Sequence, residues 1–272
     1  MNVFDFAFYV LKSKKLDGKL LDISVIDSYS INTKRSIRFI KPGRGNEISF
    51  SSKQAKFPNK EHLKTNEGKK KALHFFANHE LLAIEMMAQA ILLYPECDAV
   101  ELKKLVITLS DEQKHFRMYR SLINELGGDF GDYPVNSFFW TQMLKVNTFE
   151  QFYSLVAITF EQANLDFAKY YESFFRKNGD EKCADVLKIV YEDEISHVAR
   201  GRMYLEKELA VNQSLWDYYQ SVLPENITPS RAKGMIFDDE GRTKAGLGDH
   251  FIQSLKEYSG DFKVTKRKEW KR

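Results

Sequence analysis

The chain contains the acidic motif DExxH twice, as DEQKH at residues 111–115 and as DEISH at residues 193–197. In each copy the glutamate and the histidine are three positions apart, so on a helix they lie on one face and can bind the same ion. A single Glu-x-x-His pair is common on helix surfaces. Two copies in one chain indicate a shared chemical task, and metal coordination is the task that suits a carboxylate next to an imidazole.

Each motif is preceded by a glutamate in an apolar, helix-patterned segment, 32 residues upstream in the first copy and 33 in the second. Four helices that turn these residues inward would supply four carboxylates and two imidazoles, the ligand set of a carboxylate-bridged di-iron or di-manganese site. Burying four carboxylates without cations would cost several kcal/mol for each, and two metal ions remove that cost. The six predicted ligands are Glu80, Glu112, His115, Glu161, Glu194 and His197.

Two helix hairpins are the elements expected to position these ligands. Apolar periodicity, capping residues and Pro or Gly breaks predict four long helices, over residues 67–94, 98–126, 148–177 and 180–210. The turn-rich, aromatic stretch at 129–140 would connect the two hairpins. Two tight hairpins joined by one long crossover is a ferritin-like topology, so the predicted fold is all-α, a ferritin-like four-helix bundle.

The register of the ligands within each hairpin supports this arrangement. Because a helix rises about 1.5 Å per residue, ligands on facing helices must lie at similar distances from the turn. Counted from the first turn, Glu80 and Glu112 differ by about one residue, whereas the rival Glu85 differs by about four. On the second hairpin the count favours Asp166 slightly over Glu161, and the internal repeat decides for Glu161.

Further residues are expected to support the ligands. The repeat pairs Glu85 with Asp166, and each lies about 140° around its helix from the upstream ligand glutamate. Both suit a role in accepting the second ring N–H of a ligand histidine, as metal-bound imidazoles usually require. Two aspartates compete for this role, and two tyrosines are expected to line the site, with aromatic packing as their alternative. These four residues are Asp111, Asp193, Tyr119 and Tyr191.

The flanking segments give the chain three predicted parts. Residues 1–66 are expected to form a short amphipathic helix over residues 1–20 and then an irregular arm, with a strand pair as one option. Residues 67–210 form the bundle. Residues 211–272 form a helical and loop extension that packs on the bundle as a lid or an edge and ends in a basic tail.

The charge of the chain is unevenly distributed. Residues 1–71 contain 16 Lys and Arg against 7 Asp and Glu, and residues 263–272 contain six basic side chains and one acidic side chain. Basic ends around an acidic middle predict contact with an anionic partner such as RNA, for which solvated flanks are the alternative interpretation.

Cysteine content and hydropathy bear on the compartment. The two cysteines, Cys97 and Cys183, form no CxxC motif, which is typical of a reducing compartment and argues against a thiolate metal site. No apolar run approaches the roughly 18 residues of a membrane span, and the N-terminus is a poor signal peptide. A cytoplasmic protein without a membrane segment is therefore expected.

Several stretches carry a resemblance to a known family. They are ALHFFANHELLAIEMMAQAILLYPE, LSDEQKHFRMYRSLINELGGDFGDYPVNSFFW, TFEQANLDFAKYYESFF and YEDEISHVARG, together with FDFAFYVLKSKKLDGKL and RAKG…AGL near the two ends. These stretches resemble a bacterial family of uncharacterised ferritin-like proteins, distantly related to the di-iron hydroxylase that acts on a modified adenosine in tRNA. The resemblance implies a ferritin-like bundle with a metal pair held by the same six ligands, and it supplies no substrate.

A two-iron carboxylate centre is suited to reducing dioxygen, so the first hypothesis is an oxygen-dependent hydroxylase or oxidase with RNA or a nucleotide as a candidate substrate. The expected cofactor is two iron ions, with manganese or a mixed iron–manganese pair as the alternative. Dioxygen or peroxide would be the co-substrate, and a separate donor would supply electrons. A rubrerythrin-like peroxidase or oxygen scavenger is the second hypothesis, against which stands the lack of a Cys₄ iron site. A non-enzymatic iron-binding or storage protein is the third.

Overall fold

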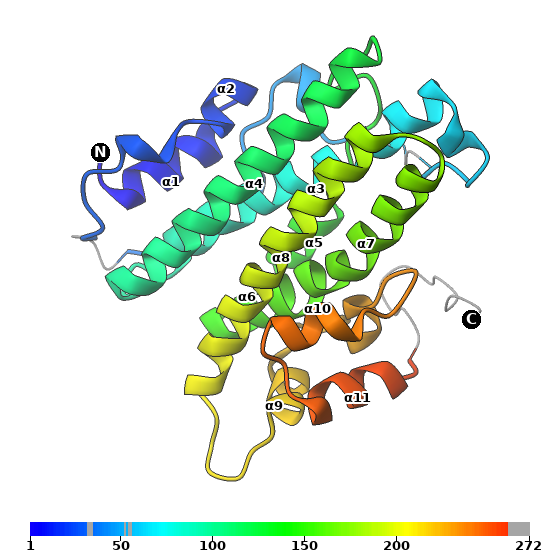
Figure 1. Ribbon diagram of the computed structural model, residues 1–272. Coiled ribbons are helices and arrows are strands. Elements are labelled where there is room, and N and C mark those ends of the chain that lie inside the picture. Colours follow the sequence, from blue (N-terminus) through cyan, green and yellow to red (C-terminus); the bar gives the residue numbers. More distant parts are fainter. Residues whose placement is uncertain (32–34, 52, 54–55, 261–272) are drawn as a thin grey trace. The chain divides into compact units, whose positions relative to one another are not determined.

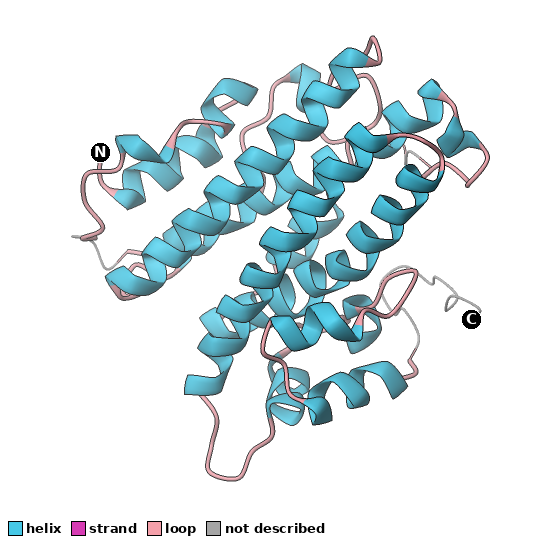
Figure 2. Ribbon diagram, viewed as in Figure 1, coloured by secondary structure: helices cyan, strands magenta, loops and turns pink. Residues whose placement is uncertain are grey.

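The computed structural model describes residues 1–31, 35–51, 53 and 56–260 of the chain (Figure 1). Figure 2 shows that these residues form helices and loops and that no strand occurs among them. The predicted all-α fold is confirmed. The strand pair considered for the arm is absent from the described residues, where extended backbone forms only the isolated bridges Asn2–Ser28 and Phe50–Val135. The predicted basic tail, residues 263–272, lies outside the described residues.

The chain divides into two compact units, Met1–Leu144 and Lys145–Arg272. Each unit contains one of the two predicted helix hairpins. The sequence predicted three parts, namely an arm, a bundle and an extension. The contacts instead group the N-terminal arm with the first hairpin and the C-terminal extension with the second.

The first hairpin consists of α3 (Asn66–Leu93) and α4 (Ala99–Glu125), which pack along each other (Figure 1). Both helices begin with an N-cap side chain that accepts hydrogen bonds from backbone N–H groups of the first turn. The Thr65 side chain accepts a hydrogen bond from the Gly68 N–H, and the Asp98 side chain accepts from two N–H groups of the first turn of α4. The helix bounds agree with the predicted helices 67–94 and 98–126 to within one residue.

The N-terminal arm packs on this hairpin. The predicted amphipathic helix over residues 1–20 is present, but it is interrupted between α1 (Val3–Lys12) and α2 (Leu16–Lys19). The buried face of α1, which includes Phe6 and Leu11, packs on α3, and the short helix α5 (Phe138–Met143) packs on α3 as well.

The second hairpin consists of one interrupted helix and one regular helix. The first arm runs through α6 (Phe149–Leu155), a π-helical turn (Val156–Glu161) and α7 (Gln162–Lys177). The second arm is α8 (Glu181–Lys207), which packs against α7. The predicted helix over 148–177 is therefore confirmed at both ends, and the π-helical turn within it was not predicted.

The C-terminal extension packs on the second hairpin. It contains α9 (Leu215–Val222), α10 (Asp239–Lys244) and α11 (Asp249–Glu257). The first of these contacts α6 and α8, and α10 contacts α7 and α8. Among the described helices, none combines the length and apolar character needed to cross a bilayer.

Candidate metal centre

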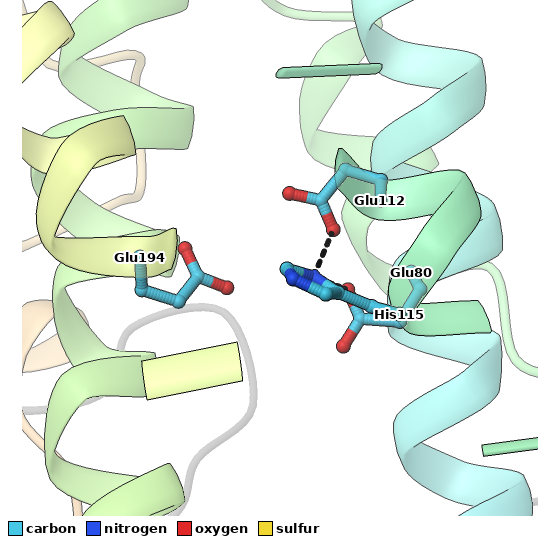
Figure 3. Close-up of side chains that lie close together, drawn as sticks. All are labelled: Glu80, Glu112, His115 and Glu194. Carbon is cyan, nitrogen blue, oxygen red and sulfur yellow. Dashed lines mark ion pairs between the residues drawn. The ribbon is translucent and has the colours of Figure 1, made fainter. Parts of the chain in front are cut away.

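Helices α3 and α4 bring together the three predicted ligands of the first unit, Glu80, Glu112 and His115 (Figure 3). Their ligand atoms lie within 4.8 Å of one another. His115 Nδ1 is 3.8 Å from Glu80 Oε2 and 3.5 Å from Glu112 Oε2, the second of which is the dashed contact in Figure 3. Each of the three residues is at most 4% exposed. Figure 3 also labels Glu194, which belongs to the second unit.

The second unit forms an equivalent triad from Glu161, Glu194 and His197. Their ligand atoms also lie within 4.8 Å of one another, and all three side chains are buried. His197 Nδ1 is 3.2 Å from Glu194 Oε2 and 4.0 Å from Glu161 Oε1. Each unit therefore contains one complete copy of the Glu…Glu-x-x-His set, with the glutamates and the histidine contributed by two packed helices.

The electrostatics of the first triad favour a bound cation. Burial, followed by the charge of Glu112 and a hydrogen bond to it, raises the pKa of Glu80 well above its ordinary value. Two buried carboxylates side by side must either take up a proton or share a cation. Two carboxylates and one imidazole are donors that suit iron or manganese, so each triad could hold a metal ion.

The π-helical turn ends at Glu161, so this candidate ligand lies where the chain passes from the π-helical turn into α7. Thr159 Oγ1 donates a 2.7 Å hydrogen bond to the Ser154 carbonyl oxygen, five residues earlier. The Tyr219 hydroxyl lies 2.9 Å from Thr159 Oγ1 and is the donor of that pair, because the threonine proton is already engaged. π-helical turns concentrate at functional sites. The threonine in the apolar run VAITFE is the only sequence hint of this feature.

Asn164 contributes a contact that sequence reasoning missed. Its Nδ2 donates a 2.7 Å hydrogen bond to Glu194 Oε1, from α7 to α8. Asn164 follows Glu161 by three positions, so on a helix it lies on the same side as that ligand. A polar residue three positions after a predicted ligand could therefore have been predicted to contact the site.

Glu85 and Asp166 do not have the expected histidine partners. Glu85 forms ion pairs with Lys19 Nζ at 3.1 Å and with Arg44 Nη2 at 2.7 Å. Asp166 accepts both Nη groups of Arg242, at 2.6 and 2.9 Å. Their oxygens are occupied by buried cations from segments far away in sequence, so the expected hydrogen bonds to the ligand imidazoles are not formed.

Asp166 also accepts the backbone N–H groups of Gly234 and Asp238. Gly234 approaches it so closely that an added Cβ would lie 2.6 Å from the Asp166 Cβ. A glycine is therefore required at this position. The Asp166 carboxylate thus links the C-terminal extension to α7 by hydrogen bonds.

The remaining four predicted supporting residues lie in different surroundings. Tyr191 donates a 2.7 Å hydrogen bond to Asp238 Oδ2 in the C-terminal extension. Tyr119 is buried, with its ring centroid 5.6 Å from that of Phe76, while Asp111 lies 3.9 Å from Lys114 and Asp193 is half-buried. The proposed supporting roles of Asp111, Asp193 and Tyr119 stay predictions.

Two histidines of α3 are held by aromatic rings outside the triad. His74 stacks on Phe130 and accepts the Gly131 N–H through Nε2, and His79 stacks on Phe139. Burial lowers the pKa of both imidazoles to about 4. They are neutral at physiological pH.

Comparison with known proteins adds one match. The family described as "Protein of unknown function (DUF455)" matches residues 11–253, which include both triads and most of the two flanking segments. No curated protein and no solved structure matches the chain.

Proposed function

The chain belongs to that family of unknown function, and we propose that it is a dinuclear metal protein, an oxygen-dependent hydroxylase or oxidase with a di-iron carboxylate centre. The observation that carries this proposal is the pair of buried triads, each built from two glutamates and a histidine on two packed helices. In this proposal each triad holds one ion, so the six ligands bind two ions per chain. Manganese or a mixed iron–manganese pair is the alternative cofactor.

The donor set supports redox chemistry more than a structural role. Iron held by carboxylates and imidazoles supplies electrons to dioxygen, which is the chemistry that such a centre adds to a protein. The chain contributes the ligands and a dry environment. The three side chains of the first triad are themselves at most 4% exposed, which keeps this environment largely free of solvent.

Metal content tests the dinuclear proposal. We expect the full-length protein to take up two equivalents of iron per chain under anaerobic conditions. Replacing a ligand, as in Glu194→Ala, should lower the content to one equivalent or less while the helix content by circular dichroism persists. Glu192→Ala is the matched control, because Glu192 is an exposed glutamate two residues earlier on α8. Two equivalents retained by Glu194→Ala would remove Glu194 from the ligand set.

Oxygen chemistry separates the three function classes. An oxidase or hydroxylase charged with ferrous iron should consume dioxygen repeatedly when a reductant is supplied. A rubrerythrin-like peroxidase would instead turn over hydrogen peroxide faster than dioxygen. A storage protein would accumulate many ferric ions per chain and stop. Measurement of oxygen and peroxide consumption, together with the iron-to-chain ratio, distinguishes these outcomes.

We also propose RNA, or a nucleotide, as the substrate class, contacted through the basic N-terminal arm and the basic C-terminal tail. The arm exposes basic side chains that include Arg35, Arg38 and Lys41. Affinity for tRNA should then fall steeply with salt, because each neutralised phosphate releases counterions, and removal of residues 263–272 should flatten that dependence. Absence of tRNA binding at low ionic strength would exclude this substrate class and favour a small molecule.

A further inference from the structure

The two triads differ at the position three residues after the upstream ligand glutamate. Asn164 follows Glu161, and Ala83 follows Glu80. The six-residue stretches 80–85 and 161–166 share one burial pattern, in which only the fourth residue is half-buried and the other five are buried. Ala83 and Asn164 are therefore equivalent positions of the repeat with different chemistry.

Asn164 controls how the Glu194 carboxylate presents its two oxygens. The 2.7 Å hydrogen bond from Asn164 Nδ2 occupies Glu194 Oε1, and the other oxygen, Oε2, lies 3.2 Å from His197 Nδ1. An ionised carboxylate only accepts, so the amide must present its N–H₂ side. The hydrogen bond thus fixes the orientation of the Glu194 carboxylate relative to the imidazole.

The first triad has no hydrogen-bond donor side chain at the corresponding position, Ala83. The Ala83 methyl group cannot donate a hydrogen bond, so nothing from that position orients the Glu112 carboxylate. Residues that orient metal ligands tune metal affinity, because a ligand held in place loses less conformational freedom on binding. The difference between alanine and asparagine is therefore a difference between the two triads.

We propose that Asn164 is a positioning residue that makes the two metal positions inequivalent, by orienting Glu194 for the ion held by the second triad. This inference rests on the proposed dinuclear function. Loss of an outer partner of this kind typically lowers metal affinity by about 10- to 100-fold. Asn164→Ala should therefore weaken one of the two binding events by about that factor and leave the other unchanged. Because the substitution is charge-neutral, a general change of charge does not contribute.

The test is a titration of the metal-free full-length protein with cobalt(II) alone, followed by visible absorbance. We expect the wild-type protein to bind two equivalents in two resolved steps. In Asn164→Ala, one step should weaken and its d–d absorption bands should shift, while the bands of the other step stay the same. Asn178→Ala is the matched control, since Asn178 is exposed at the end of α7 and bonds only within that turn. The reciprocal variant Ala83→Asn should change the step that Asn164→Ala leaves unchanged.

The outcomes separate the two proposals. If the wild-type protein binds two equivalents and Asn164→Ala leaves both affinities and both spectra unchanged, the positioning role is overturned and the dinuclear function stands. Equal weakening of both steps would indicate general structural loss and would also overturn the positioning role. If the wild-type protein binds fewer than two equivalents, the dinuclear function fails, and this inference fails with it.

Discussion

The two helix hairpins bury a second carboxylate at the same position, five residues after the ligand glutamate, and neutralise it in different ways. In the first hairpin, Glu85 lies between two cations of the N-terminal arm, Lys19 and Arg44. In the second hairpin, Asp166 accepts both Nη groups of one cation, Arg242, and two backbone N–H groups of the C-terminal extension.

The two copies of the repeat therefore have buried carboxylates with different partners. Both copies share the Glu-x-x-His spacing and the position of the buried acid, because each of these two spacings lies within a single helical arm. The cations come from flanking segments that are unrelated to each other in sequence. The first carboxylate has two charged partners and the second has one, so the two ion pairs are expected to differ in their tolerance to substitution.

The largest effect is expected from removing the single cation of the second hairpin. Arg242→Met leaves Asp166 as a buried charge without a cationic partner, which typically costs about 3–5 kcal/mol of unfolding free energy. Urea denaturation followed by circular dichroism measures this loss. Lys244→Met is the control, because Lys244 pairs only with Glu240 on the surface of α10. A loss below that of Arg44→Met would contradict the comparison.

The π-helical turn is the second difference between the hairpins. Thr159→Val removes the hydroxyl that serves both the Ser154 carbonyl and the Tyr219 hydroxyl, and it leaves both of them buried without this partner. We expect a loss of about 2–3 kcal/mol, because buried unsatisfied polar groups cost about 1–3 kcal/mol each. Thr141→Val is the matched control, since Thr141 makes a similar backbone hydrogen bond on the surface of α5. Equal losses in the two variants would show that the turn needs no special support.

Acid sensitivity should be concentrated in the first unit because of its buried neutral imidazoles. The pKa of His74 is lowered to about 4 in the folded protein, below the ordinary value of 6.5. Its contribution to stability is therefore complete above pH 6.5 and is lost as the pH falls toward 4. Between pH 8 and pH 5 the loss amounts to about 2 kcal/mol.

His74→Gln keeps an acceptor for the Gly131 N–H and cannot be protonated, so the variant should lose less unfolding free energy over this pH range. Chemical denaturation at pH 8 and at pH 5 measures the difference. His250→Gln, at an exposed histidine of α11, should follow the wild-type pH profile. An unchanged pH dependence in His74→Gln would assign the acid sensitivity to other groups.

The smallest effect is expected from removing one of the two cations of the first hairpin. In Arg44→Met, Lys19 Nζ stays within 3.1 Å of Glu85 and continues to balance its charge. Arg44 also donates hydrogen bonds to both Glu85 oxygens and to the Ile48 carbonyl oxygen. The expected loss of unfolding free energy is about 1.5 kcal/mol, the lower end of the range for hydrogen bonds to a charged group, because Lys19 still neutralises the carboxylate. The double variant Lys19→Met/Arg44→Met should lose more than the sum of the single variants, because partners that share one charge are not additive. Strict additivity would contradict the idea that the two cations substitute for each other.

The sequence by itself predicted the helices and the six candidate ligands. Hydrophobic periodicity and capping residues are local, so they predicted α3, α4 and α8 closely and the ends of the α6–α7 segment. The repeated pattern combines the local Glu-x-x-His spacing with an upstream glutamate, 32 or 33 residues earlier, on the facing arm of a helix hairpin. It predicted two Glu…Glu-x-x-His sets, and within each unit the structure brings the three residues of each set together.

Only the tertiary structure decided the partners of the supporting residues. Glu85 meets Arg44 across 41 residues of sequence and Asp166 meets Arg242 across 76, and no local pattern records such a pairing. The π-helical turn also depends on distant groups, because Tyr219 on α9 completes the hydrogen bonding of Thr159. A buried carboxylate takes the strongest donor that packing brings within reach, and that donor is set by how the flanking segments fold onto the hairpin.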